Sequence, residues 1–447
     1  MSEPIISVSG LRGIVGESLV PETAIRYVCA FASLLPAGPI VVTRDGRATG
    51  RWLADAIRGG LAAAGRDVLD AGVAATPTTG VLVRQLAAAG GIQISASHNP
   101  AEYNGLKLFS SEGRVISAAA GEKVIARYRA GDLRWASHDK IGHATACEDP
   151  HLHHADLVLA TVGVERIRRR RFKVLLDANH GAGSLLGRRL LEGLGCRLTL
   201  LGGEPDGRFE HTPEPTAENL AGVLEQVTAA GADAGFCQDP DADRLAIIDE
   251  RGRYLGEEYT LAICADHLLR SNPGAVVTNC STSRMTEDLA NRYQVPFSRS
   301  AVGEANVTEV MQRHAAVLGG EGNGGVIDPR VGYVRDSFVG MALVLDAMTA
   351  RELPVSRLAD ELPRYEIVKT KIALAPGKVL PGLEALAEHF HDAAADRLDG
   401  LRLDWPGKWL LVRASNTEPI LRAIAEAETA AEARRLCDEA ARVLVGV

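Results

Sequence analysis

The chain has 447 residues, of which 46% are hydrophobic and 24% charged; these values are typical of a soluble globular protein and exclude wholesale disorder. Asp and Glu outnumber Lys and Arg by 57 to 49, which gives a net charge of −8 and argues against a nucleic-acid partner. At about 150 residues per domain, this length predicts roughly three domains, with about two to four allowed.

The amino-terminal segment MSEPIISVSGLRG does not resemble a targeting signal. It contains Glu3, no basic region and too short an apolar run, and no other run approaches the ~18–20 apolar residues that span a bilayer. The seven cysteines are scattered and form no CxxC pair, which is typical of reduced core cysteines. We therefore expect a cytoplasmic protein with no membrane partner.

Three segments share one pattern, a strand followed by a glycine-rich turn and an amphipathic helix, and the pattern is weakest in the third. They begin at Pro39, Phe172 and Gly274. Apolar strands that alternate with helices predict parallel strands covered on both faces, and hence three α/β units of similar topology. From about Ile367 we expect a smaller α+β unit with a first strand, a helix near 382–398, one tryptophan-bearing strand and a helix from Thr429.

These patterns place domain boundaries near residues 146, 250 and 366. The predicted domains cover residues 1–146, 147–250, 251–366 and 367–447. The second contains the basic run 166–171, RIRRRR. No aromatic residue interleaves this run, so we interpret it as a solvated face rather than a nucleic-acid site.

The segment GGIQISASHNPAEYNGLKLF, from Gly90 to Phe109, places a polar loop at the end of an apolar strand. Ligands of α/β sheets bind beyond the carboxyl ends of the strands, so Ser97 in this loop is a candidate nucleophile. No GxSxG elbow surrounds Ser97, and hydrolase triad chemistry is therefore not supported. From this segment alone, an ordinary polar loop closed by Pro100 is the alternative.

The segment from Asp233 to Glu250 sets three carboxylates, those of Asp239, Asp241 and Asp243, between two strand-like runs. Three clustered carboxylates can converge on one hard cation, and without a cation they repel one another. The spacing imitates an EF-hand loop, but Arg244 stands where that loop needs glycine. We therefore predict a divalent-metal loop that prefers Mg²⁺, with a charged turn as the alternative.

Two later loops carry groups suited to a sugar and to a phosphate. In the glycine-rich segment Leu318–Pro329, Glu321 and Asn323 offer a carboxylate and an amide to sugar hydroxyls. In Leu411–Arg422, a strand presents Arg413 with three further donors that match a phosphate monoester: Ser415, Asn416 and Thr417. Taken singly, the first segment also fits a connector and the second a capped turn.

In this order, the four motifs resemble those of the α-D-phosphohexomutases, the superfamily of phosphoglucomutase, phosphomannomutase and phosphoglucosamine mutase. The resemblance runs from SGLRGIVG at Ser9 to RASNTEP at Arg413. SASHNP is similar to the phosphoserine loop of the family, DPDADR to its metal loop, GGEGNGG to its sugar loop and RASNTEP to its phosphate loop. The resemblance implies an α/β fold with three related α/β domains of mixed sheets and a smaller C-terminal α+β domain around a central cleft.

The resemblance also implies roles for individual residues. Ser97 would carry the phosphoryl group and, through it, ligate one Mg²⁺ beside Asp239, Asp241 and Asp243. The other catalytic residues would be Lys107, as general base or charge stabiliser, Arg12 and Arg244, which flank the phosphoryl group, and His98. The substrate would be bound at its hydroxyls by Glu321 and Asn323, and at its non-reacting phosphate by Arg413, Ser415, Asn416 and Thr417. Arg44 and Arg47 would support the Ser97 loop.

The implied activity is the interconversion of a hexose 6-phosphate and 1-phosphate by an intramolecular phosphotransferase of the isomerase class. It would proceed through phospho-Ser97 and a hexose 1,6-bisphosphate, which would also act as activator. The partner would be a small phosphorylated sugar, and we expect a monomer or homodimer.

Two departures from the family's patterns bear on the sugar. Many bacterial members read GE-x-S-G-H in the sugar loop, where this chain has Asn323 and Gly325, and glycine here predicts a less crowded loop. The segment RSAVGEANV at Arg299 lacks a GHS signature, and its VGE resembles phosphoglucosamine mutases and archaeal-type enzymes. We therefore favour glucosamine phosphate. The alternatives are a phosphomannomutase/phosphoglucomutase of the same mechanism, a hexose-bisphosphate synthase or phosphatase, and a non-catalytic phosphosugar-binding protein.

Overall fold

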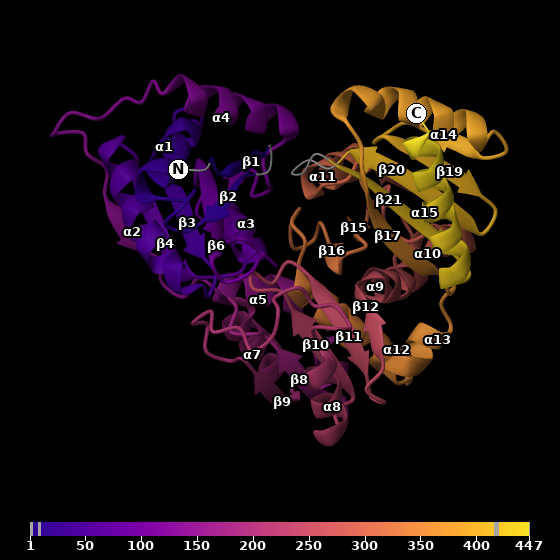
Figure 1. Ribbon diagram of the computed structural model, residues 1–447. Helices are drawn as coiled ribbons and strands as arrows, with labels where there is room; N and C mark the ends of the chain where they lie inside the picture. Colours follow the sequence, from indigo (N-terminus) through magenta and orange to yellow (C-terminus); the bar gives the residue numbers. More distant parts are fainter. Residues whose placement is uncertain (1–2, 8–9, 415–419, 447) are drawn as a thin grey trace.

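The computed structural model describes residues 3–7, 10–414 and 420–446. Four β-sheets follow one another along the chain. Figure 1 shows the first unit (indigo) and the C-terminal unit (yellow) as two arms, with the second and third units below and between them. Helices and mixed sheets alternate through the first three units, which confirms the predicted fold class.

The first unit is built on a mixed seven-stranded sheet in the order β1-β2-β6-β5-β3-β4-β7. Its strands are β1 (Ile5–Ser7), β2 (Gly10–Ile14), β3 (Ile40–Arg44), β4 (Val68–Val73), β5 (Gly90–Ile94), β6 (Tyr103–Ser110) and β7 (Ala144–Ala146), and its helices are α1 (Pro21–Ala32), α2 (Ala48–Ala63), α3 (Thr76–Gln85) and α4 (Ala118–Ala130). The strand β3 is parallel to β4 and β5, whereas β6 runs antiparallel to β5 and β2. Helices cover both faces of this sheet, which is why β3 and β5 are nearly continuous apolar runs.

The second and third units have sheets in the orders β12-β11-β10-β8-β9 and β14-β13-β15-β16. The second contains β8 (Lys173–Asp177), β9 (Arg197–Leu201), β10 (Ala234–Gln238), β11 (Leu245–Asp249) and β12 (Tyr254–Gly256), with α5 (Leu152–Leu159), α6 (Val164–Arg170), α7 (Gly183–Gly193) and α8 (Ala221–Ala229). The third contains β13 (Val276–Asn279), β14 (Phe297–Ser300), β15 (Leu318–Glu321) and β16 (Gly325–Ile327), with α9 (Glu257–Ser271), α10 (Met285–Arg292), α11 (Glu304–Arg313), α12 (Ser337–Arg351) and α13 (Val355–Asp360).

These two units share one hydrophobic core. Phe236 of β10 and Leu261 of α9 belong to the same buried cluster as Phe338 and Met341 of α12. The helix α12 is apolar on nearly every side and is buried over most of its length, as expected for a helix enclosed by others rather than lying on a surface. The second and third units therefore form one common base for the two arms.

The fourth unit is an antiparallel sheet in the order β17-β21-β20-β19-β18. Its elements are β17 (Glu366–Ala373), the 3₁₀ turn η1 (Pro376–Lys378), α14 (Val379–His389), β18 (Ala394–Asp396), β19 (Leu401–Trp405), β20 (Lys408–Ala414), β21 (Ile420–Ala427) and α15 (Ala430–Val445). Thr429 caps α15, as its position predicted. The helix expected near 382–398 ends at His389, and the single tryptophan strand is a hairpin, because Gly407 turns the chain at φ 77°.

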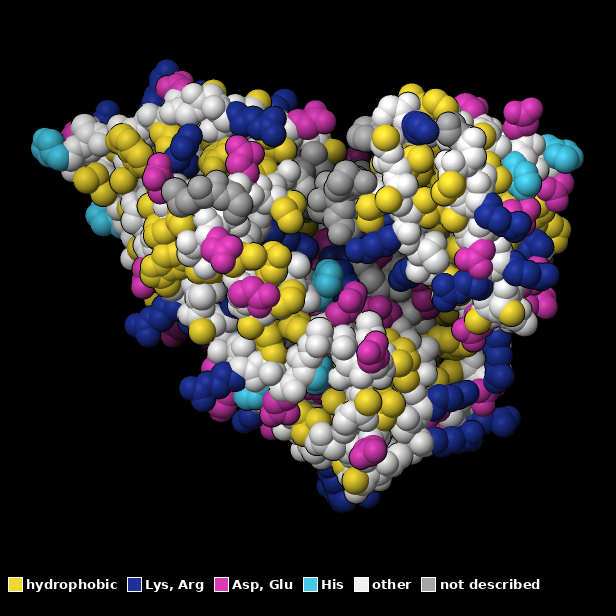
Figure 2. Space-filling model, in the orientation of Figure 1, with side chains coloured by type: hydrophobic (Ala, Val, Ile, Leu, Met, Phe, Trp, Pro, Cys, Tyr) yellow, Lys and Arg dark blue, Asp and Glu magenta, His cyan; other side chains and the backbone are white. Residues whose placement is uncertain are grey.

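Figure 2 shows a deep notch between the two arms, with basic, acidic and histidine side chains at its floor. This notch is the expected central cleft. Over the described ranges, no helix has the length and apolar character needed to cross a membrane.

Candidate active site

Ser97 lies in a constrained position just beyond β5. It is buried, and its backbone adopts a left-handed φ of 51°, an unfavourable conformation for a non-glycine residue that surrounding contacts must hold in place. Its N–H donates to Ser95 Oγ at 2.8 Å, and Ser95 Oγ donates to Asp45 Oδ2 at 2.7 Å. The Ser97 hydroxyl donates to Asp239 Oδ2 at 2.8 Å, which joins the first unit to the second.

A single buried arginine holds the backbone of the Ser97 loop. The Arg47 guanidinium donates, at 2.5–2.9 Å, to four carbonyls, those of Ser97, Asn99, Pro100 and Tyr103. Its Nε donates to Asp45 Oδ2 at 3.2 Å. Arg44 does not contact the Ser97 loop in this way. Among the described residues, it donates one hydrogen bond, to the Asp45 carbonyl at 3.5 Å.

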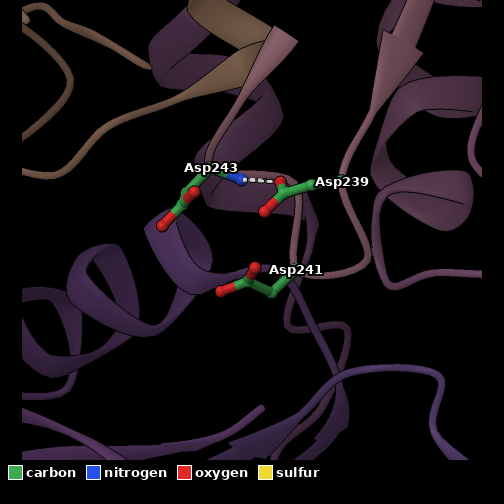
Figure 3. Close-up of side chains that lie close together, drawn as sticks. All are labelled: Asp239, Asp241 and Asp243. Carbon is green, nitrogen blue, oxygen red and sulfur yellow. Dashed lines mark hydrogen bonds between the residues drawn. The ribbon is translucent and has the colours of Figure 1, made fainter. Parts of the chain in front are cut away.

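The three aspartates converge in the loop between β10 and β11 (Figure 3). They are fully buried, and one oxygen from each lies within 4.8 Å of the others. Asp239 Oδ1 accepts the backbone N–H groups of Asp243 and Arg244, each at 3.1 Å. Burial raises the pKa of Asp239 well above its usual range, and the neighbouring Asp241 and Asp243 carboxylates raise it further.

Cations from two other units balance this charge. Lys107 Nζ on β6 donates to Asp241 Oδ2 at 2.5 Å and to Asp243 Oδ2 at 2.8 Å. Arg335 Nη2 donates to Asp243 Oδ2 at 2.7 Å. Burial alone would raise the pKa of Asp241, but the Lys107 ammonium and the hydrogen bonds to Lys107 and Thr76 together outweigh burial and hold that pKa below its usual range.

The donor set fits a hard divalent cation. Asp241 Oδ1 and Asp243 Oδ1 are buried and have no hydrogen-bond partner among the described residues. An unpartnered buried carboxylate oxygen is costly unless a cation satisfies it. Buried carboxylate oxygens are the ligands that Mg²⁺ and Ca²⁺ prefer, so this group of residues can bind a metal ion.

The surroundings of Ser97 are strongly positive. Arg12 Nη1 donates to Asn99 Oδ1 at 3.1 Å, and Arg244 Nε is buried without a hydrogen-bond partner in the described part of the chain. His98 Nδ1 lies 3.3 Å from Ser97 Oγ. Repulsion by Arg244, together with burial and Arg12, lowers the pKa of His98 to about 2. The loop is therefore a ready site for an anion.

Glu321, at the end of β15, is buried and surrounded by donors. Its Oε1 accepts Asn279 Nδ2 at 2.7 Å and the Gly303 N–H at 3.1 Å, and its Oε2 accepts Arg335 Nη1 at 2.7 Å. Asn323 Nδ2 lies 3.5 Å from Glu321 Oε2. Both carboxylate oxygens of Glu321 are therefore already engaged by donors of the protein.

Arg335 is the main site residue that the sequence did not reveal. It donates to three carboxylates from three segments, Asp243 at 2.7 Å, Glu304 at 2.9 Å and Glu321 at 2.7 Å. Glu304 is the acid of the VGE segment, and burial raises its pKa to about 7 against the effect of Arg335. A Cβ on Gly325 would lie 2.3 Å from the Arg335 side chain. The loop at Gly325 is therefore closely packed rather than open, because the Arg335 side chain fills the space beside it.

The phosphate loop is only partly described. Arg413, at the end of β20, is buried, and its Nε donates to Asp399 Oδ2 at 2.9 Å. The same oxygen accepts the Val302 N–H of the third unit at 3.0 Å. The predicted residues Ser415, Asn416 and Thr417 lie outside the described residues.

Comparisons with known proteins agree with this arrangement. Models of the four phosphoglucomutase/phosphomannomutase domains match residues 5–135, 152–252, 257–365 and 372–443, as α/β/α domains I, II and III and the C-terminal domain. A "Phosphoglucomutase/phosphomannomutase" of Thermococcus kodakarensis is 37% identical over 444 residues and covers 97% of both chains. A "Probable phosphoglucosamine mutase" of Methanopyrus kandleri is 34% identical over 436 residues, covering 96% of this chain and 95% of its own.

Among solved structures, a phosphoglucomutase/phosphomannomutase family protein from Burkholderia thailandensis superposes with a TM-score of 0.86 at 27% identity, over 98% of this chain and 96% of its own. The fold, with its acidic loop facing a buried serine, defines a phosphohexomutase, an isomerase-class phosphotransferase. The chain belongs to the phosphoglucomutase/phosphomannomutase family of the α-D-phosphohexomutase superfamily.

We predict that Arg47→Lys destabilises the protein and lowers its activity. A lysine keeps the charge but cannot donate to four carbonyls and a carboxylate together, so unfolding should cost about 3 kcal/mol less. Denaturant unfolding and mutase assays measure both effects. Arg44→Lys is the matched control and should shift stability by less than about 1 kcal/mol. Equal effects of the two substitutions would contradict the assigned role of Arg47.

Proposed function

We propose that this chain interconverts hexose 6-phosphates and hexose 1-phosphates through phospho-Ser97 and a hexose 1,6-bisphosphate. The observation that carries the proposal is the contact between Ser97 Oγ and Asp239 at 2.8 Å, because it sets the hydroxyl against the acidic loop. A phosphoryl group on this oxygen would lie among Arg12, Arg244 and Lys107.

In the first transfer, a sugar hydroxyl oxygen forms a bond to the phosphorus of phospho-Ser97 while the bond from phosphorus to Ser97 Oγ breaks. The sugar hydroxyl loses its proton, and Ser97 Oγ gains one to become a hydroxyl. Such transfers depend on positioning and charge neutralisation more than on covalent chemistry. Mg²⁺ held by Asp239, Asp241, Asp243 and the phosphoserine would supply part of that neutralisation. Lys107, which bridges two of these aspartates, is proposed as a charge stabiliser.

The resulting bisphosphate then turns end for end, and its other phosphate passes to Ser97. The groups far from Ser97 must therefore accept both orientations of the sugar. We assign the non-reacting phosphate to Arg413 and its neighbours Ser415, Asn416 and Thr417, and the hydroxyls to Glu321 and Asn323. An unphosphorylated Ser97 has no phosphoryl group to transfer. Added hexose 1,6-bisphosphate, which can phosphorylate Ser97, should therefore also activate the enzyme.

The sugar is proposed to be glucosamine phosphate, with glucose and mannose phosphates as the second candidates. Relatives named for glucosamine phosphate and for glucose and mannose phosphates both align with nearly the whole chain. A carboxylate at Glu321 favours an ammonium on the sugar. Its pairing with Arg335 offsets that preference, which supports broad rather than strict specificity.

Ser97→Ala should lower mutase turnover by orders of magnitude and leave the fold intact, because only the hydroxyl is removed. Intact-mass spectrometry should find one removable phosphate on the parent protein and none on the variant. Ser110→Ala is the matched control, since among the described residues that hydroxyl bonds only the Arg114 carbonyl, at 3.4 Å. Full activity of the Ser97 variant would eliminate the phosphoserine mechanism.

Metal removal should abolish activity. Asp241→Asn removes one of the three charges, so the variant should bind Mg²⁺ more weakly and need more of it for half-maximal rate. Excess Ca²⁺ should inhibit, because its looser coordination misplaces a phosphoryl oxygen. Titration calorimetry measures the Mg²⁺ affinity, and rates across Mg²⁺ concentrations give the concentration needed for half-maximal rate. Asp132→Asn, at an exposed aspartate, is the control. A chelator-resistant enzyme would refute the metal assignment.

Specificity constants for glucosamine, glucose and mannose 1-phosphates should fall within about two powers of ten, with glucosamine phosphate at least equal to the others. Single hydroxyl contacts are worth ~1–3 kcal/mol, which limits the discrimination that this site can provide. A coupled assay over the three substrates checks the expectation. If glucosamine phosphate is not converted, the substrate proposal is wrong and the mutase reaction itself is unaffected. Formation of free sugar would instead favour a phosphatase, and accumulation of bisphosphate would favour a synthase.

A further inference from the structure

A second cavity lies between the second and third units, and none of the proposed active-site residues lines it. It has a volume of about 510 Å³, and its walls come from α6, α9, α12 and the neighbouring loops. That volume is within the range of small-molecule sites, which occur preferentially where domains meet.

The wall of this cavity is unusually basic. Four arginines line it, Arg166, Arg270, Arg330 and Arg351. They are accompanied by His267 and by a single carboxylate, Asp346. We call these four arginines the basic wall. The basic run 166–171 contributes only Arg166 to this wall.

Asp346 is fully occupied by its neighbours. Its Oδ1 accepts Arg166 Nε at 3.0 Å and the Gly163 N–H at 3.2 Å. Its Oδ2 accepts Arg166 Nη2 at 2.7 Å and His267 Nε2 at 2.9 Å. This carboxylate therefore neutralises Arg166 and leaves the other three arginines of the wall without a carboxylate in the cavity itself.

Carboxylates that do not line the cavity hold the other arginines in place. Arg270 pairs with Asp266 at 3.0 Å, Arg330 with Asp328 at 2.5 Å and Arg351 with Glu361 at 2.7 Å. These pairs fix the guanidinium groups and lower the entropy cost of binding a ligand. They engage only some of the five N–H donors that each guanidinium carries.

One donor shows that the wall is incompletely satisfied. Arg351 Nη1 is buried and has no hydrogen-bond partner among the described residues, and the Asp266 Oδ2 oxygen lies 3.9 Å away, beyond hydrogen-bond distance. A buried charged donor without a partner is unfavourable, so the Arg351 guanidinium keeps unused hydrogen-bonding capacity at the edge of the cavity.

Helix electrostatics does not account for the whole cluster. Basic residues are common in the last turn of a helix, and Arg270 and Arg351 occupy such positions in α9 and α12. Arg330 lies in a loop, and Arg166 lies in a different unit on α6. Their convergence with Arg270 and Arg351 on one cavity therefore calls for another explanation.

We propose that this cavity binds a small polyanion that carries two or more phosphate or carboxylate groups. Planar guanidinium groups match both kinds of anion with paired hydrogen bonds, and four of them exceed what one monoanion can engage. The helices α9 and α12 begin beside the candidate active site, since Glu258 of α9 lies against Gly322 and Arg335 precedes α12. Their other ends line the cavity. A bound ligand would therefore stabilise the packing of the second unit against the third.

Calorimetric titration of the full-length protein with pyrophosphate, and separately with citrate, tests the proposal. With pyrophosphate we expect two binding events, one at the active site and one in the cavity. Arg413→Gln should weaken only the first. Arg166→Met and Arg351→Met should each weaken the second by about tenfold or more, as for a lost charge-assisted hydrogen bond. If citrate binds and the cavity variants weaken its binding, carboxylate groups are sufficient for binding in the cavity. If citrate does not bind, the ligands of the cavity are restricted to phosphates.

Arg168→Met is the matched control, because Arg168 is on the same helix as Arg166, is similarly exposed (46% against 51%) and also pairs with a carboxylate, Glu165. It should change neither binding event. Arg166 is half-exposed, so its variant keeps the test valid even where Arg351→Met fails to fold. A single pyrophosphate event that disappears in Arg413→Gln and is unchanged in both cavity variants, with no citrate binding, would overturn the proposal.

Discussion

The arrangement of the active site depends on one electrostatic constraint, the burial of three carboxylates within 4.8 Å of one another. Such a group is unstable unless cations are close, because repulsion between like charges is strong where water is excluded. Lys107 comes from the first sheet and Arg335 from the segment that precedes α12, so charge balance is reached only when three units are packed together. In the described part of the chain, two of these carboxylate oxygens have no hydrogen-bond partner and are therefore available to a cation.

Arg335 and Asp399 extend this charge balance across the base to the fourth unit. A hydrogen-bonded series connects the phosphate loop to the metal loop, and its members are Arg413, Asp399, Val302, Gly303, Glu321, Arg335 and Asp243. The adjacent backbone N–H groups of Val302 and Gly303 bridge its two halves. Glu321 therefore links the two halves of this series, because it accepts hydrogen bonds from both Gly303 and Arg335.

Rigid support for the Ser97 loop comes from a different interaction. The Ser97 loop takes a strained backbone conformation that Arg47 stabilises through four carbonyls. Arg47 is itself fixed by Asp45 at the end of β3, the neighbour of β5 in the sheet. Strain at a functional loop persists only where surrounding contacts over-determine it, and here the contacts come from the next strand of the same sheet.

The sequence by itself determined the fold class and located the Ser97 loop and the acidic loop, which the structure brings together, because apolar strands, turn residues and clustered carboxylates are local patterns. The roles of the residues in the four loops stay predictions. It did not reveal that the tryptophan strand is a hairpin, although the Pro406–Gly407 pair marks that turn. Only the tertiary structure identified Arg335, which is 92 residues from Asp243, and showed that its side chain occupies the space beside Gly325. Nothing in the residues around Arg335 distinguishes it from a solvated arginine, since its three carboxylate partners are brought together only by the packing of the second and third units.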